Sequence, residues 1–91
     1  MALFGHRMRA EWALDPGILY LNHGTVGATP RRVLARQQAI RDEMEAQPAR
    51  FLLRECSRLV GAPRTAPALW RLAAAEVADF CGCDGDDLVF V

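Results

Sequence analysis

The residues best suited to chemistry form a short polar loop, Asn22-His23-Gly24-Thr25. An Asn amide and a Thr hydroxyl can donate hydrogen bonds to a carboxylate, and a glycine lets backbone N–H groups approach the same oxygens. The imidazole of His23 could donate a hydrogen bond or move a proton near neutral pH. The residues alone favour a simpler interpretation, in which Gly24 and Gly27 give the loop unusual backbone angles or a close approach and Asn22 caps the turn. A substrate-binding loop stays open as the alternative.

Basic residue usage limits what the chain can do by itself. The 91 residues include 11 basic side chains, all of them Arg, and no Lys. Chemistry that needs a lysine amine, such as a Schiff base or a P-loop, therefore cannot be completed by this chain. Eleven acidic residues bring the net charge to zero, so no long-range field attracts nucleic acid or an anionic membrane. We expect neither partner.

The apolar spacing predicts a mostly helical chain with two short strands. Helices are expected over residues 31–46, 49–60 and 68–81, and strands over 18–21 and 88–91. Thr29 is expected to cap the first helix with Pro30 in its first turn, Pro48 to separate the first two helices, and Gly82 to end the third. A turn is expected over 84–87.

The spacing of Trp70 and Phe80 indicates core positions on the third helix rather than a ring-stacking surface. Residues 61–67, with one Gly and two Pro, form the only plausible linker and a candidate subdomain boundary. The apolar run 88–91 is typical of a buried strand, which needs neighbours to pair its backbone. We therefore expect the chain to be incomplete as a folding unit.

Three cysteines, Cys56, Cys81 and Cys83, cannot all pair, and the first dozen residues contain no secretory signal core. We expect reduced thiols, buried or partly buried at a helix end, in a cytoplasmic chain. The C-x-C spacing does not match the zinc knuckle, and the two histidines lie far away in the sequence. No metal site is expected.

Five segments in this order resemble the start of a class V aminotransferase-family enzyme, nearest to the isopenicillin N epimerase-like branch. They are Leu14–Pro16, Tyr20–Pro30, Glu45–Leu52, Val77–Gly82 and Asp86–Val91. The resemblance covers the chain from about Trp12 to Val91. Enzymes of this branch often begin with an LNHGS-x-G loop, and Thr25 keeps the hydroxyl of the common Ser. The ordered set is more specific than the loop alone.

The resemblance implies the N-terminal segment of a fold-type I, aspartate aminotransferase-like α/β enzyme that uses pyridoxal 5'-phosphate. Residues 1–62 would contribute the N-terminal loop and helices of the small domain and the active-site mouth. Residues 63–91 would be the first helix and strand of the large cofactor-binding domain. The phosphate-binding turn, the Asp that pairs with the cofactor and the Schiff-base lysine would lie beyond this segment, so no catalytic residue is expected in this chain.

The resemblance also implies site residues. Asn22, His23, Gly24 and Thr25 would hold the amino-acid substrate, and Arg50 and Phe51 would approach the cofactor or a neighbouring subunit at a dimer interface. The alternative places Arg50 on a solvated helix face and Phe51 in the core. Arg31 and Arg32, in the first turn of a helix, indicate either an anionic neighbour or a solvent-exposed turn.

The expected function is substrate enclosure and dimer contacts within an enzyme acting on an amino acid by epimerisation, C–S bond cleavage (lyase or desulfurase chemistry) or transamination. The expected partner is a C-terminal polypeptide that binds the cofactor, either as a second chain of a split enzyme or as the rest of one longer protein. The complete unit would be a homodimer. The alternative is a non-catalytic helical interaction or dimerisation module derived from the same family.

Overall fold

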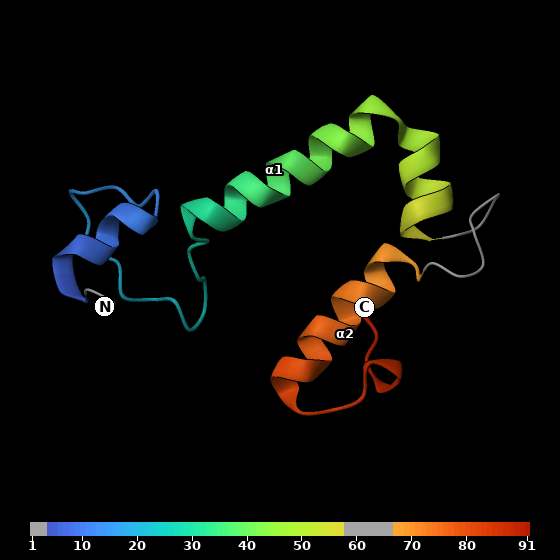
Figure 1. Ribbon diagram of the computed structural model, residues 1–91. Helices are drawn as coiled ribbons and strands as arrows, with labels where there is room; N and C mark the ends of the chain where they lie inside the picture. The colour runs from blue at the N-terminus through green and yellow to red at the C-terminus, as the bar shows by residue number, and fades with distance from the viewer. Residues whose placement is uncertain (1–3, 58–66) are drawn as a thin grey trace. The chain divides into compact units, whose positions relative to one another are not determined.

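Helices make up most of the chain in the computed structural model, which describes residues 4–57 and 67–91 (Figure 1). The elements are the 3-10 helix η1 (Gly5–Glu11), α1 (Arg31–Ala46), the π-helix η2 (Arg50–Cys56), α2 (Leu69–Cys81) and the 3-10 helix η3 (Gly85–Asp87). The expectation of a mostly helical chain is confirmed. The chain divides after Asp42 into two compact units, 1–42 and 43–91, and the predicted boundary between residues 62 and 63 lies outside the described residues.

Helix α1 has the predicted bounds, but its cap lies one residue later than expected. The backbone N–H groups of Val33 and Leu34 donate to the carbonyl oxygen of Pro30 at 3.0 and 3.1 Å. Pro30, rather than Thr29, therefore supplies the first acceptor of the helix. Pro30 also pairs with Trp12 in an isolated antiparallel bridge, which holds it just outside the helical turn.

Pro48 separates α1 from η2, as predicted. The N–H of Gln47 still donates to the carbonyl of Glu43 at 3.3 Å, but Pro48 has no N–H with which to continue the series. The N–H of Phe51 then donates to the Gln47 carbonyl at 3.0 Å, and η2 follows with the wider π-helical turn. The predicted end of this helix near Val60 lies outside the described residues.

Helix α2 ends as its sequence predicts, at a left-handed Gly82 with φ of 77°. The N–H of Cys83 donates to the carbonyl of Ala78 at 2.9 Å and the N–H of Gly82 to that of Asp79 at 3.2 Å. This pair of bonds is the Schellman motif, which satisfies carbonyls that the helix end would otherwise leave unpaired. The expected turn is also present, because the Asp84 carboxylate accepts the Asp86 N–H at 2.9 Å and caps η3.

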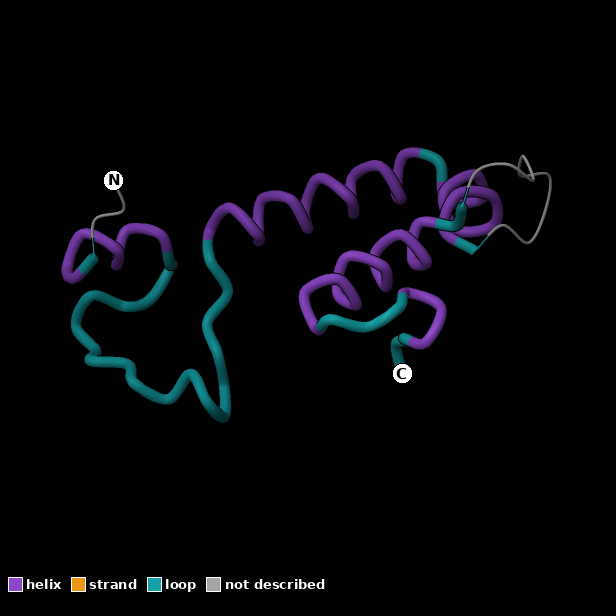
Figure 2. Tube along the Cα trace, turned by 60° about the horizontal axis from the view of Figure 1, so that its bottom comes forward, coloured by secondary structure: helices purple, strands orange, loops and turns teal. Residues whose placement is uncertain are grey.

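The two predicted strands are wrong for the described residues, whose only β-pairing is the Trp12–Pro30 bridge. Residues 18–21 lie in the loop between η1 and α1, which Figure 2 draws in teal. Residues 88–91 follow η3, and the chain after α2 turns back beside that helix in both views (Figures 1 and 2). A strand needs a second row of N–H and C=O groups, which neither run finds.

The core is small and lies in the second unit, where the buried hydrophobic residues are Phe51, Ala68, Ala74 and Ala78. The prediction that Trp70 and Phe80 are core residues is wrong, since they are 54% and 93% exposed. The reason is that α2 packs through its small residues. A Cβ built on Gly85 would lie 3.1 Å from the Cα of Ala75, so η3 approaches α2 too closely for larger side chains.

Candidate functional site

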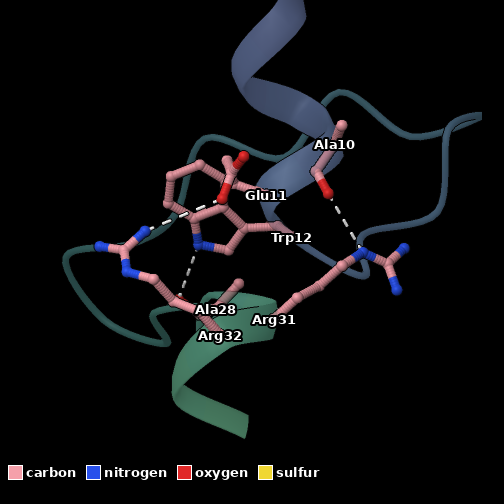
Figure 3. A network of polar contacts seen from close by, with 6 residues as sticks. All are labelled: Ala10, Glu11, Trp12, Ala28, Arg31 and Arg32. Carbon is pink, nitrogen blue, oxygen red and sulfur yellow. Dashed lines mark hydrogen bonds and ion pairs between the residues drawn. The ribbon is translucent and has the colours of Figure 1, made fainter. Parts of the chain in front are cut away.

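The polar loop is positioned by contacts between η1 and the beginning of α1 (Figure 3). The indole Nε1–H of Trp12 donates to the carbonyl of Ala28 at 3.3 Å, and Nε–H of Arg31 donates to the carbonyl of Ala10 at 3.2 Å. These bonds join the two ends of the segment between Trp12 and Pro30, so the loop in between is a closed one.

The anionic neighbour anticipated for the first turn of α1 lies in the chain itself. Arg32 and Glu11 form an ion pair at 3.8 Å, and the two side chains are 72% and 48% exposed. Solvent screens such a pair, so its energetic contribution is small compared with the hydrogen bonds beside it. Its carboxylate nonetheless places negative charge near the N-terminus of α1, where the helix dipole favours it.

Within the loop, four hydrogen bonds and one contact between aromatic rings define a turn. The N–H of Val26 donates to the carbonyl of Asn22 at 3.1 Å, and the N–H of Ala28 donates to Nδ1 of His23 at 3.2 Å. The hydroxyl of Tyr20 donates to the Val26 carbonyl and lies 3.4 Å from that of Asn22. The rings of Tyr20 and His23 meet edge to face, with centroids 4.9 Å apart.

This arrangement fixes what the loop can offer a ligand. Because Nδ1 of His23 accepts a hydrogen bond, the neutral imidazole carries its proton on Nε2, which can then act as a donor. All four residues from Asn22 to Thr25 are exposed, and within the described chain the Asn22 amide and the Thr25 hydroxyl have no hydrogen-bond partner. The loop can therefore donate several hydrogen bonds to an anionic group such as a carboxylate.

The two loop glycines have different roles. Neither Gly24 nor Gly27 has a positive φ, so the expectation of unusual backbone angles is wrong. A Cβ on Gly27 would lie 3.3 Å from the carbonyl oxygen of His23, which confirms a close approach there. A Cβ on Gly24 would meet nothing within 4 Å. Gly24 thus leaves open space beside the donors of Asn22 and Thr25.

Arg50 and Phe51 belong to the second unit, whereas Asn22, His23, Gly24 and Thr25 belong to the first. Phe51 is buried, with 7% of its surface exposed. Nε of Arg50 lies 3.1 Å from the carboxylate of Glu55, and both side chains are close to half exposed. These placements correspond to the alternative in which Arg50 lies on a helix face and Phe51 in the core.

The cysteines differ from expectation in burial. Cys81 and Cys83 are exposed, and only Cys56 is half-buried; all three are free thiols. Cys81 is the last residue of α2 and Cys83 follows the Gly82 turn, so both side chains lie at a helix end that nothing in the described chain covers. Among residues 4–57 and 67–91, no group of three or more potential ligands could hold a metal ion.

Sequence reasoning missed three positioning residues: Trp12, Tyr20 and Arg71. Trp12 and Tyr20 hold the loop as described above. Arg71, on α2, donates from Nη1 to the carbonyl of Leu88 at 2.9 Å and from Nη2 to that of Gly85. Tyr20 could have been identified from the sequence, because its hydroxyl lies only two residues before Asn22. Arg71 could not, because hydrogen bonds from a side chain to carbonyls 14 and 17 residues away leave no periodic pattern in the sequence.

The comparisons with known proteins and with protein families found no match to this chain. No family model matches it, and no curated protein or solved structure matches it either. None of the helices in the described part of the chain is long and apolar enough to span a membrane.

Proposed function

We propose that this chain is the N-terminal segment of a pyridoxal-phosphate-dependent enzyme of the class V aminotransferase family, in the isopenicillin N epimerase-like branch. Its role is to hold the carboxylate of an amino-acid substrate. The observation that carries the proposal is the loop Asn22–Thr25, which is anchored at both ends and exposes hydrogen-bond donors on one short segment.

Carboxylate binding suits this loop energetically. A hydrogen bond to a charged group contributes about 1.5–3 kcal/mol, roughly twice a neutral one. Nε2–H of His23, the amide of Asn22 and the hydroxyl of Thr25 are donors of this kind. Because the Trp12 and Tyr20 bonds already order the turn, less conformational entropy is lost when a ligand binds.

The cofactor does not fit this chain. No lysine amine is present in the sequence, and the described residues include no buried polar side chain that could form a phosphate cradle. No step of the chemistry is therefore assigned to these residues. In the proposed enzyme the cofactor, its lysine and the reaction, whether epimerisation, C–S cleavage or transamination, belong to the large domain.

Exposed apolar side chains support a larger fold around the second unit. On α2 and in the segment after η3, large hydrophobic residues are 39–93% exposed: Leu69, Trp70, Leu72, Val77, Phe80, Val89 and Phe90. Contiguous apolar surface is costly in water and marks contact surfaces. In the proposed enzyme, the large domain and the dimer partner cover it.

Arg50 is the proposed cross-subunit residue. Its guanidinium is near the surface and, among the described residues, forms an ion pair with Glu55 alone, an interaction that solvent weakens. An anion presented by the neighbouring subunit can replace Glu55, because the planar guanidinium binds carboxylate and phosphate in two-pronged fashion. Phe51, being buried, supports the helix that carries Arg50.

The experiment is isolation of the native assembly through this chain. We expect the assembly to contain additional polypeptide of large-domain size, either as a second chain or as the rest of the same protein. It should show a visible absorbance band of bound pyridoxal phosphate. Borohydride should trap the cofactor on a lysine outside these 91 residues. An assembly that stays colourless with pyridoxal phosphate and amino acids contradicts the proposal. A stable monomer or homodimer of this chain alone indicates the non-catalytic interaction module instead.

Within the cofactor-loaded assembly, Thr25 provides a matched pair of variants. Thr25→Val keeps the shape and removes the hydroxyl, so KM for the amino acid should rise about tenfold, the equivalent of one charge-assisted hydrogen bond. Thr25→Ser keeps the hydroxyl and should leave KM within about twofold. Equal KM values for the two variants would show that the hydroxyl does not contact the substrate.

A further inference from the structure

The first unit contains a hollow of about 630 Å³ between η1 and the loop that follows it. Its walls include Trp12, Leu19, Leu21 and His23, and their composition is mainly apolar. Leu19 and Leu21 are 83% and 79% exposed, which is unusual for leucines that line a concave surface. The volume lies within the range of about 300–1,000 Å³ that is typical of small-molecule sites.

Arg9 is the one permanently charged side chain among the described residues that line the hollow. The ionisable lining of the hollow consists of Arg9, His6, His23 and Tyr20, and no carboxylate is among the described residues that line it. One N–H of Arg9, at Nη2, donates to the carbonyl of Pro16 at 3.0 Å, which orients the guanidinium and leaves other donors of its five. Nε2–H of His23 is a second donor, since Nδ1 is occupied by the Ala28 N–H.

An apolar wall combined with one arginine, further neutral donors and no carboxylate in the described lining is complementary to one kind of small molecule. We propose that this hollow binds a monocarboxylate with a bulky apolar body, with the carboxylate at Arg9 and the body against Leu19 and Leu21. This site is distinct from the carboxylate contacts proposed at Asn22 and Thr25, because neither residue lines the hollow. The binding itself needs no cofactor.

Binding is measurable on the full 91-residue chain. The chain has two tryptophans, and Trp70→Phe leaves Trp12, which lines the hollow, as the only indole reporter. In that background, 3-phenylpropionate should shift the Trp12 fluorescence in a saturable manner. The uncharged 3-phenylpropanamide and the small propionate should each bind at least about fivefold more weakly, because each lacks one half of the recognition.

Variants locate the two halves of the site. Arg9→Gln removes the charge while keeping a donor for the Pro16 carbonyl, and it should weaken 3-phenylpropionate binding about fivefold or more without affecting 3-phenylpropanamide. Leu21→Ser, at an exposed position that tolerates substitution, should weaken both. Arg36→Gln, an exposed position of α1 outside the lining, is the control and should change neither.

Three results would each overturn the inference: no saturable binding of 3-phenylpropionate, equal affinity for the acid and its amide, or unchanged affinity in both Arg9→Gln and Leu21→Ser. Failure of the proposed function is a separate result, because it is observed as an assembly without pyridoxal phosphate and not as a loss of binding to this chain.

Discussion

Substitution of Trp12 is the strongest single test of how the polar loop is positioned, because its indole bonds to the loop. Trp12→Phe keeps an aromatic ring at the half-buried position and removes the Nε1–H that donates to the Ala28 carbonyl. A neutral, partly solvated hydrogen bond of 3.3 Å contributes about 1 kcal/mol net. The loop should therefore open about fivefold more often, since about 1.4 kcal/mol corresponds to a factor of ten.

Amide hydrogen exchange measured by NMR reports this opening directly. The N–H groups of Val26 and Ala28, which are bonded to Asn22 and His23, should exchange about fivefold faster in Trp12→Phe. Trp70→Phe is the matched control because Trp70 lies in the second unit, and it should leave both rates unchanged. Unchanged exchange at these two amides in Trp12→Phe would refute the anchoring argument, and equal acceleration in both variants would show a non-specific loss of stability.

Three further substitutions test other parts of the structure. Gly82→Ala should lower the free energy of unfolding by about 1 kcal/mol in urea titration, because φ of 77° disfavours a Cβ, whereas Gly82→Asn should cost less; equal stability of the two would contradict the left-handed cap. Arg71→Lys keeps the charge but cannot bind the Leu88 and Gly85 carbonyls with a planar fork, so protease cleavage after Leu88 should accelerate several-fold. An unchanged cleavage rate would contradict the role of Arg71 in holding this segment. Arg50→Gln should change the free energy of unfolding by about 0.5 kcal/mol or less, because the Glu55 pair is exposed to solvent; a loss above about 1 kcal/mol would assign Arg50 a structural role.

Local signals allowed most of the helical elements to be predicted. Pro48 removes one N–H and Gly82 permits a left-handed residue, and both effects act within a few residues of the position itself. The ends of α1 and α2 were accordingly predicted to within a residue. The shift of the α1 cap from Thr29 to Pro30 depends on pairing with Trp12, which is a contact across 18 residues that local propensity does not describe.

The core and the strands could not be predicted, because they depend on neighbours. Phe80 has the spacing of a core residue, yet it is 93% exposed since α2 packs through Ala74 and Ala78 instead. Periodicity identifies an apolar face but not which element will cover it. The run 88–91 has strand-forming residues and still forms no ladder, because no described segment offers it a complementary row of backbone groups.

The polar loop was predicted as a candidate site from its residue types, but the contacts that hold its conformation were not predicted. From sequence, Gly24 and Gly27 were expected to shape it through unusual backbone angles or a close approach, and only the close approach of Gly27 to the His23 carbonyl is found. Side chains also shape the loop: Nδ1 of His23 accepts one loop N–H, and the Tyr20 hydroxyl donates to a loop carbonyl. His23 is therefore a structural acceptor at Nδ1 and an available donor at Nε2.

The structure explains why arginine suits several of the basic positions in this chain. Arg9, Arg31 and Arg71 each donate to main-chain carbonyls 7 to 21 residues away and so join parts of the chain that are distant in sequence. The bond from Arg31 uses Nε–H and the bonds from Arg71 use both terminal nitrogens, geometries that an ammonium group cannot reproduce. In a chain with so little buried apolar surface, these guanidinium bonds define the paths of the segments that the helices alone would leave free.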